Sequence, residues 1–402
     1  MAPSPNLKRR ETLQNTEHSF SCGGTIVCGA VCQEGYYPDK PAHINQDAMA
    51  THAEFCGRPG ELFMGVFDGH GPYGDVASTL AKELVPMHME RLHSESHDQD
   101  EVGADFEQAF LRANSEILAK MGEQSNFSGT TGIAALLIDD VLHVANVGDS
   151  RAIMGKALPG ASQWKVVPLS IDQTAFRDDE RQRCRADAQA PVSFATMSMI
   201  EGDTPMSENF GEESIEAAAD PPRVWLEGKM CPGTAFTRSL GDAVAKLVGV
   251  VAKPELCTVQ LTENAKAIVL ASDGVFEFME NEEVLAVAQK YAPDATAAAN
   301  EMVKISFNRW MESGEERTDD ITAVVCYLEG FAAPASKWDK VRQYALPNFN
   351  NRPASKFGSV VLDVLKTFKH YGRDLHVQQL FPNFDWSQKG IEAEIGTTIK
   401  YT

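Results

Sequence analysis

The sequence has no long hydrophobic run and no cysteine pair at the spacing that metal-binding motifs use. Its longest apolar stretches, such as Ile133–Ile138, have the length of a strand, whereas a membrane helix needs about 20 apolar residues. We therefore expect a soluble protein without a membrane span. The eight cysteines are scattered and form no Cys-x-x-Cys pair, so neither a zinc knuckle nor a disulfide framework is favoured.

Positive charge is also scarce. Among 402 residues, 57 are Asp or Glu and only 36 are Lys or Arg, for a formal net charge of −21. Such a field repels polyanions, so nucleic-acid binding is not expected, and divalent cations are the natural counter-ions. The N-terminus has no apolar signal core, and Ala2 stands where myristoylation requires glycine. These features predict a reducing compartment, cytoplasmic or nuclear.

Hydrophobic residues make up 43 % of the chain, enough for a sizeable core, and their pattern changes along the sequence. Residues 1–20 are polar and predict a disordered leader. Between residues 21 and 330, short β-type runs recur and helical patterns interrupt them, the last of these with Asp294 as its cap. Tight turns join neighbouring strand runs, and strands do not alternate strictly with helices. The pattern therefore favours an α+β layered sandwich over a doubly wound parallel sheet.

Two segments depart from this pattern. Residues 173–222 combine a charged stretch with a Ser/Glu/Gly/Met-rich one, which predicts an insertion or lid. Residues 331–402 contain ten Lys or Arg against six Asp or Glu, together with many aromatic residues and a helical apolar pattern over 360–368. That tail has too much apolar surface for a free linker. We expect it to dock on the preceding domain, with binding to a partner as the alternative.

Several β-type runs end at, or begin just after, an aspartate. These aspartates are Asp68, Asp149, Asp273 and Asp319. A single Asp-Gly after a strand is most often a turn, but strand ends in sheets stacked about 10 Å apart bring several carboxylates into one cleft. Like charges held close together raise a pKa or recruit a cation, and oxygen ligands suit Mg²⁺ or Mn²⁺. The set therefore predicts a metal site, where Gly69 could offer its carbonyl without an obstructing side chain.

Six short motifs occur in sequence between residues 67 and 321. They are Phe67-Asp68-Gly69-His70-Gly71, Ser128-Gly129-Thr130-Thr131, Asn146-Val147-Gly148-Asp149-Ser150-Arg151-Ala152, Arg238-Ser239-Leu240-Gly241-Asp242, Ala271-Ser272-Asp273-Gly274 and Asp319-Asp320-Ile321. In this order they resemble the metal-dependent serine/threonine protein phosphatases of the 2C type, over about residues 20–330. The resemblance implies a four-layer α-β-β-α sandwich of two antiparallel sheets flanked by helices.

The resemblance also implies a centre of two Mg²⁺ or Mn²⁺ ions and a weaker third site. Asp68 would bridge the first two ions and Gly69 would lend its carbonyl. The remaining ligand positions would be Asp273 and Asp319 at the first metal, Asp47 at the second through ordered waters, and Asp149 with Glu277 at the third. Many relatives carry Asp where this chain has Glu277.

The activity implied is hydrolysis of phosphoserine and phosphothreonine in a phosphoprotein substrate, by in-line attack of a metal-bridging hydroxide. His70 would be the general acid, a role typically worth 10²–10⁴-fold in rate. We expect a monomer. Residues 173–222 correspond in position to the family's flap, which predicts a part in substrate selection; an inert disordered insertion is the alternative.

The chain departs from the family pattern at two positions, where Ala42 and Gln46 replace an Arg and a Glu. A neutral methyl group cannot replace a guanidinium fork at a phosphate, so Lys40 or His43 is predicted to bind phosphate instead. These departures leave a pseudophosphatase, acting as a binding or regulatory module, as the alternative. Retention of Asp68, Asp273 and Asp319 favours catalysis.

Four of the motif positions could have a structural role instead of a catalytic or metal-binding one. His70 could be a turn histidine that hydrogen-bonds to the backbone, and Asp149 could pair locally with Arg151. Asp242 is interpreted as structural rather than as a ligand. The segment 128–131 is interpreted as the entry to a strand below the site, because it lacks the surroundings of an activated serine.

Overall fold

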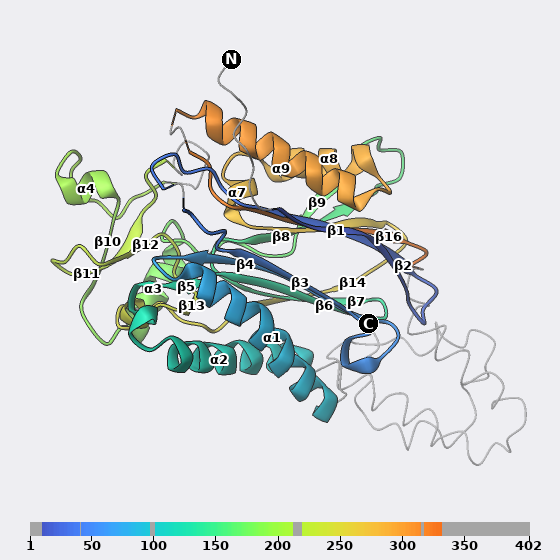
Figure 1. The fold of residues 1–402 in the computed structure, drawn as a ribbon, viewed down its shortest axis with the longest axis horizontal. Coiled ribbons are helices and arrows are strands. Elements are labelled where there is room, and N and C mark those ends of the chain that lie inside the picture. The colour runs from blue at the N-terminus through green and yellow to red at the C-terminus, as the bar shows by residue number, and fades with distance from the viewer. Residues whose placement is uncertain (1–9, 41, 97–100, 212–218, 315–316, 332–402) are drawn as a thin grey trace, which may run out of the picture. The chain divides into compact units, whose positions relative to one another are not determined.

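The computed structural model describes residues 10–40, 42–96, 101–211, 219–314 and 317–331, which all belong to one unit, Met1–Ala333. They form two packed antiparallel sheets with helices on both outer faces (Figure 1). This arrangement confirms the α-β-β-α sandwich. The tail predicted to dock, from residue 332 onward, lies outside the described residues.

One sheet has six strands, each antiparallel to its neighbours. Their order is β1 (Arg10–Ser19), β2 (Thr25–Gln33), β16 (Ile321–Glu329), β15 (Ala265–Ala271), β8 (Arg151–Lys156) and β9 (Lys165–Pro168). Strand β1 corrects the prediction of a disordered leader for residues 10–19, which pair with β2 on both sides of a register shift between Leu13 and Thr16; residues 1–9 lie outside the described residues. The polar sequence of β1 is consistent with its place at the edge, where few side chains are buried.

The second sheet contains the strand that leads to Asp68. Its order is β13 (Leu240–Gly241), β5 (Gly129–Thr130), β4 (Glu61–His70), β6 (Gly132–Ile138), β7 (Val141–Val147) and β14 (Glu255–Gln260), and β3 (Asp47–Ala53) also pairs with β4. The predicted strand runs are therefore present, and β3 is one that the sequence patterns missed.

Side chains alternate along β4 between two hydrophobic layers, as the two-residue period of a strand requires. Met64 and Val66 point between the sheets and pack with Ile26 and Ile268 of the opposite sheet. Phe63 and Phe67 point outward and pack under α1 (Gly74–Ser96) and α2 (Val102–Met121). Helices α7 (Asp273–Phe276), α8 (Asn281–Tyr291) and α9 (Ala295–Glu312) cover the outer face of the six-stranded sheet (Figure 1).

The predicted cap of the last helix is present: Asp294 Oδ1 accepts a hydrogen bond of 2.9 Å from the Ala297 amide. Two short 3-10 helices, Phe55–Gly57 and Gly122–Phe127, lie between β3 and β4 and between α2 and β5. None of the helices in the described ranges is both long and apolar enough to span a bilayer.

The insertion is ordered in its described residues, so the alternative of an inert disordered segment is wrong for them. It contains α3 (Asp178–Asp187), β10 (Val192–Ala195) and α4 (Met197–Glu201). Strand β10 pairs with β11 (Arg223–Leu226), which pairs with β12 (Pro232–Thr234), and α6 (Ala243–Lys246) follows. A small hydrophobic cluster around Phe194 and Val224 holds these elements together.

Candidate active site

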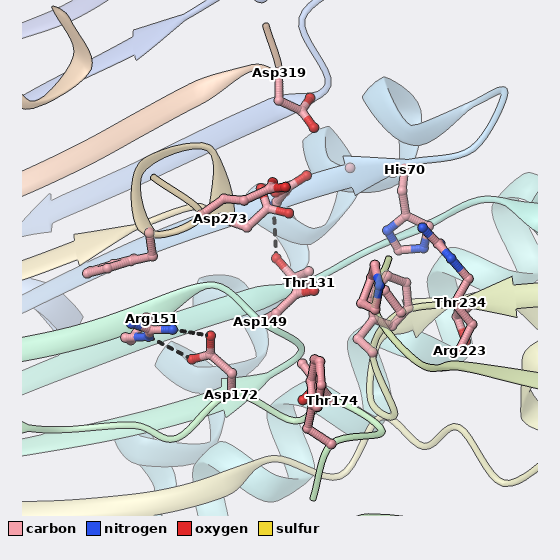
Figure 2. A pocket seen from close by; sticks show the side chains of 18 of the residues that line it. His70, Thr131, Asp149, Arg151, Asp172, Thr174, Arg223, Thr234, Asp273 and Asp319 are labelled. Atoms are coloured by element: carbon pink, nitrogen blue, oxygen red, sulfur yellow. Dashed lines mark hydrogen bonds and ion pairs between the residues drawn. The ribbon is translucent and has the colours of Figure 1, made fainter. Parts of the chain in front are cut away.

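A polar pocket opens at one end of the sandwich, where strand ends of both sheets meet the insertion. Among the predicted site residues, it is lined by Asp68, Gly69, His70, Asp149, Asp273, Glu277 and Asp319. Figure 2 shows Asp319 and Asp273 on one side of this pocket and His70 with Arg223 on the other. The structure therefore brings together residues that are up to 251 positions apart in the sequence.

Asp47 and Asp68 are direct partners in the ladder between β3 and β4, so their side chains lie on the same face of the sheet. The Asp68 amide donates to Thr131 Oγ1 at 3.1 Å, and its carbonyl accepts from the Thr131 amide at 2.8 Å. Asp47 Oδ2 accepts from Ser272 Oγ at 2.9 Å and from Thr322 Oγ1 at 2.6 Å. Neighbouring strands thus fix the position of both carboxylates.

Asp273 begins α7 directly after β15, and Asp319 lies two residues before β16. Because these two strands pair, their ends carry both carboxylates to the rim where Asp68 lies. Asp273 lies close enough to Asp68 for its charge to add to burial in raising the pKa of the Asp68 carboxyl group. Tyr37 donates to Asp319 Oδ1 at 2.8 Å and so holds that carboxyl group in place.

The pKa of every carboxyl group in this cluster is raised. Burial is the main cause at Asp47, Asp68 and Asp273, and neighbouring carboxylates add to it at Asp47 and Asp68. Burial and the charges of Asp273 and Asp320 raise the pKa of Asp319 to about 7. These shifts are what uncompensated negative charge in a closed space produces. A cation in the cluster would remove their cause.

Two carboxylate oxygens give a direct test of whether the cluster fits a metal. Asp47 Oδ1 and Asp273 Oδ1 are buried and make no hydrogen bond within the described part of the chain. Buried polar atoms normally have a partner, and anionic oxygen is what Mg²⁺ and Mn²⁺ bind. The donor set therefore fits a divalent cation.

Gly69 and its surroundings leave no room for a side chain. A Cβ at this position would lie 2.2 Å from the Gly74 carbonyl oxygen and 2.6 Å from that of Gln46. The Gly69 amide donates to the Gln46 carbonyl at 3.1 Å, and Gln46 Nε2 donates to the Gly71 carbonyl at 2.9 Å. Gln46, the departure from the family pattern, thus supports the backbone between Asp68 and His70.

Asp149 and Glu277 lie further along the same pocket. Glu277 is one turn after Asp273, with its amide donating to the Asp273 carbonyl at 2.7 Å, so both side chains lie on one face of that turn. Arg151 forms a two-point ion pair with Asp172, with Nη2 to Oδ2 at 2.7 Å and Nε to Oδ1 at 2.9 Å (Figure 2). Asp172 is thus an ionic partner of Arg151.

His70 is not a backbone-bonded turn histidine. It ends β4, its Nε2 lies 2.8 Å from Asp242 Oδ2, and its ring packs 4.5 Å from the ring of Phe236 between centroids. Burial raises the pKa of Asp242, but the charges of His70 and Lys246 and the hydrogen bonds it accepts outweigh burial and lower it. A carboxylate thus orients the imidazole at the pocket wall.

The segment 128–131 has the structural role that the sequence indicated. Ser128 is fully buried; its Oγ accepts from the Tyr73 amide at 3.0 Å and its carbonyl accepts from the Asp242 amide at 3.0 Å. Thr131 supports Asp68, as described above. No hydrogen-bonded base is part of the described surroundings of Ser128, which is consistent with strand entry and not with a nucleophile.

The predicted phosphate-binding residues do not reach the pocket. His43 Nε2 is 3.0 Å from Asp320 Oδ1, and Lys40 Nζ lies 5.9 Å from the Tyr37 ring centroid; neither lines the cavity. The pocket is lined instead by three arginines, Arg151, Arg223 and Arg317. The physical reason is Asp320, whose carboxylate also accepts from the Gly35 and Gln46 amides and holds this loop beside the pocket.

Arg223 belongs to β11, next to the insertion, and faces the cavity beside His70 (Figure 2). Its Nη1 donates to the Gly233 carbonyl at 3.1 Å, whereas its Nε is buried without a hydrogen bond in the described part of the chain. Thr234 Oγ1, on the neighbouring strand, is likewise buried without a partner there. Arg223 belongs to none of the sequence motifs, and the one sequence signal for it is a positive charge directly after the polar insertion.

Among the described residues, the acidic side chains whose ligand atoms all lie within 4.8 Å of one another belong to a different group, Asp179, Glu180 and Glu255. Arginines already neutralise it: Arg238 Nη2 lies 2.6 Å from Glu180 Oε1, and Arg177 Nη1 lies 2.8 Å from Glu255 Oε2. This group is an ion-pair network that ties the insertion to the sandwich.

The sequence is similar to known proteins. The family model described as Protein phosphatase 2C matches residues 41–310. The chain is similar to Probable protein phosphatase 2C 35 of Arabidopsis thaliana, with 39 % identity over 76 % of this chain and 84 % of that protein. It is similar to Probable protein phosphatase 2C 64 of Oryza sativa subsp. japonica, with 30 % identity over 71 % of this chain and 63 % of that protein.

Its fold is also similar to a solved structure, the crystal structure of serine-threonine phosphatase 2C from Toxoplasma gondii. The TM-score is 0.62 at 17 % sequence identity, and the match covers 80 % of this chain and 99 % of that one. At this identity the match concerns the fold, and it agrees with the two-sheet sandwich described above.

Proposed function

Since this chain belongs to the protein phosphatase 2C family and is a protein serine/threonine phosphatase, we propose that its aspartate cluster holds Mg²⁺ or Mn²⁺ and that His70 is its general acid. Its substrates are phosphoproteins. The pseudophosphatase alternative gains no support, because the curated relatives are named as phosphatases and the carboxylates converge in one pocket.

The single observation that carries the metal proposal is a set of buried carboxylates with unpartnered oxygens. Asp47, Asp68, Asp273 and Asp319, with the Gly69 carbonyl, would hold two ions, and Asp149 with Glu277 would hold a weaker third. When bound, the ions supply positive charge for the phosphoryl oxygens and an activated water. Each buried carboxylate otherwise repels its neighbours, as its raised pKa indicates.

His70 would act on the leaving oxygen. The alkoxide of serine or threonine is a poor leaving group, so a proton delivered in the transition state speeds its departure. Asp242 accepts one ring N–H of His70 at Nε2, which leaves the other ring nitrogen to face substrate. The same contact holds the imidazole ring in place at the pocket wall.

Arg223 would bind the substrate phosphate, in place of the Lys40 or His43 that the sequence suggested. Its position in the pocket wall and its unpartnered Nε support this role, because a guanidinium donates two N–H groups to adjacent phosphate oxygens. The insertion would contribute to substrate selection, since Ala219 and Pro221 also line the cavity. We further propose a monomer of the cytoplasm or nucleus, for which the eight unpaired thiols are the support.

The test is hydrolysis of 4-nitrophenyl phosphate and of a phosphothreonine peptide with Mn²⁺, and then with excess chelator. We expect activity that disappears with chelator, returns on adding Mn²⁺, and is lost in Asp68→Ala and Asp273→Ala. A matched control is Asp203→Ala, whose side chain is exposed in the insertion. Hydrolysis that survives chelation, or that persists in Asp68→Ala, would reject the proposal.

A further inference from the structure

Lys246, the last residue of α6, is enclosed below the general-acid site. Its Nζ donates to the Ser239 carbonyl at 2.7 Å and to Ser239 Oγ at 3.2 Å. Ser239 is fully buried, and its hydroxyl donates to Asp242 Oδ2 at 2.6 Å. The same oxygen lies 2.8 Å from His70 Nε2. A continuous chain of hydrogen bonds therefore runs from Lys246 to the imidazole.

Lys246 restricts the orientation of the Ser239 hydroxyl group. An ammonium group can only donate, so the Ser239 oxygen accepts from it and must turn its own proton elsewhere. The acceptor available is Asp242 Oδ2. Without the ammonium, the Ser239 hydroxyl could rotate away, and Asp242 would lose both a hydrogen bond and a nearby positive charge.

Lys246 is half-buried, which costs its ammonium group part of its hydration, and within the described part of the chain no carboxylate touches it. Within the described part of the chain, both of its hydrogen bonds go to neutral oxygens of Ser239. Burial lowers the pKa of Lys246 to about 8, although the charge of Asp242 opposes the shift. Simple packing would be served as well by an apolar side chain, so the cost points to a role in arranging Asp242.

We propose that Lys246 is a positioning residue for the general acid: through Ser239 it directs the Asp242 carboxylate at His70. This inference rests on the proposed function of His70. Lys246 does not touch substrate. It contributes to the step in which the leaving oxygen takes a proton, and to no other step.

The test compares two substrates that differ in how much they need that proton. In a phosphoserine peptide the leaving group is the serine alkoxide. In 4-nitrophenyl phosphate the leaving group is 4-nitrophenolate, which is stable without a proton. We expect Lys246→Met and Ser239→Ala to lower kcat on the peptide about 10-fold to 100-fold, the range for residues that orient a catalytic group. On the aryl phosphate the loss should stay within about threefold, and Lys246→Arg should restore part of the peptide rate.

Lys253→Met is the matched control, because Lys253 is exposed and pairs with Glu107 at 3.0 Å on the surface. It should leave both rates unchanged. Calorimetric titration with Mn²⁺ should give wild-type affinity in Lys246→Met, since the lysine acts on His70 and not on the aspartate cluster. If Lys246→Met does not fold, Ser239→Ala, which removes one hydroxyl, decides the question.

Equal losses on both substrates, unchanged peptide rates, or weakened Mn²⁺ binding in the folded variant would overturn the role of Lys246. His70→Ala separates this failure from failure of the proposed function. If His70→Ala loses rate selectively on the peptide and Lys246→Met does not, the inference alone is wrong. If His70→Ala affects both substrates equally, the general-acid role itself is wrong.

Discussion

His70 Nε2 lies 2.8 Å from Asp242 Oδ2, across a sequence separation of 172 residues. Asp242 adopts a left-handed backbone conformation, with φ 52°, immediately after the two-residue strand β13. Strand β13 pairs with β5, and β5 pairs with the end of β4 that carries His70. The ladder of short strands is therefore what places this carboxylate behind the imidazole.

Replacing Asp242 with Asn should reproduce much of the effect of losing His70. Asn keeps the size of the side chain but removes the negative charge that lies beside the His70 ring. We expect Asp242→Asn to lose about 10-fold or more in kcat on a phosphoserine peptide and far less on 4-nitrophenyl phosphate. Parallel loss on the two substrates would show that the contact serves stability alone.

Metal addition should stabilise the protein, and removal of one carboxylate should abolish that effect. In the absence of metal, Asp68→Asn relieves repulsion and should melt at or above the wild-type temperature. Mn²⁺ at a hundredfold excess over Kd adds about 2.7 kcal/mol to wild-type stability. Differential scanning fluorimetry should show that increase as a higher Tm in wild type and in Asp203→Asn, but not in Asp68→Asn. A similar rise in Asp68→Asn would argue against the metal centre.

Arg223 and Lys40 provide a direct comparison of two candidates for phosphate binding. Hydrogen bonds to charged groups are worth about 1.5–3 kcal/mol, which corresponds to roughly 10-fold to 150-fold in affinity. We expect Arg223→Met to raise KM for a phosphopeptide within that range. Lys40→Met should leave KM unchanged, because Lys40 does not line the pocket. The opposite order would return the assignment to Lys40.

Acid should destabilise the protein by protonating Glu180, which belongs to the ion-pair network of the insertion. Burial raises the pKa of Glu180, but hydrogen bonds from Arg238, Arg183 and Thr237 outweigh burial and hold the pKa far below its ordinary value of 4.5. A lowered folded-state pKa means that this stabilisation is complete above the unfolded pKa and is lost as pH falls below it. Wild type should therefore lose stability steeply below about pH 4.5.

Glu180→Gln provides the control for that prediction. At pH 7 it should cost about 3–5 kcal/mol, because it removes the buried carboxylate that buried Arg238 and half-buried Arg183 share. Below pH 4.5 its unfolding free energy should fall less than that of wild type, as followed by urea denaturation. Identical pH dependence in the two proteins would show that Glu180 is not the group that titrates.

The fold and the positions of the clustered aspartates at strand ends were largely predictable because both follow from local patterns. Strand runs such as 268–271 combine consecutive apolar residues with a following aspartate, and the paired strands β15 and β16 then carry Asp273 and Asp319 to one rim. The edge strand β1 was missed because its polar side chains lack the apolar alternation of a half-buried strand. The helix α3 was missed because charged residues occupy nearly all of it.

The sequence alone was enough to predict the family, the two-sheet fold class and the aspartates that converge at the pocket. Each of these predictions rests on short motifs of a few consecutive residues. Long-range packing decided which groups meet across the pocket: Asp242 with His70, Arg223 in place of Lys40 and His43, and Lys246 behind Ser239. Such contacts depend on how strands β13, β5 and β4 pair and on where the insertion folds back. Sequence spacing carries no information on that pairing, because the free energy that selects it comes from burying side chains of distant segments together.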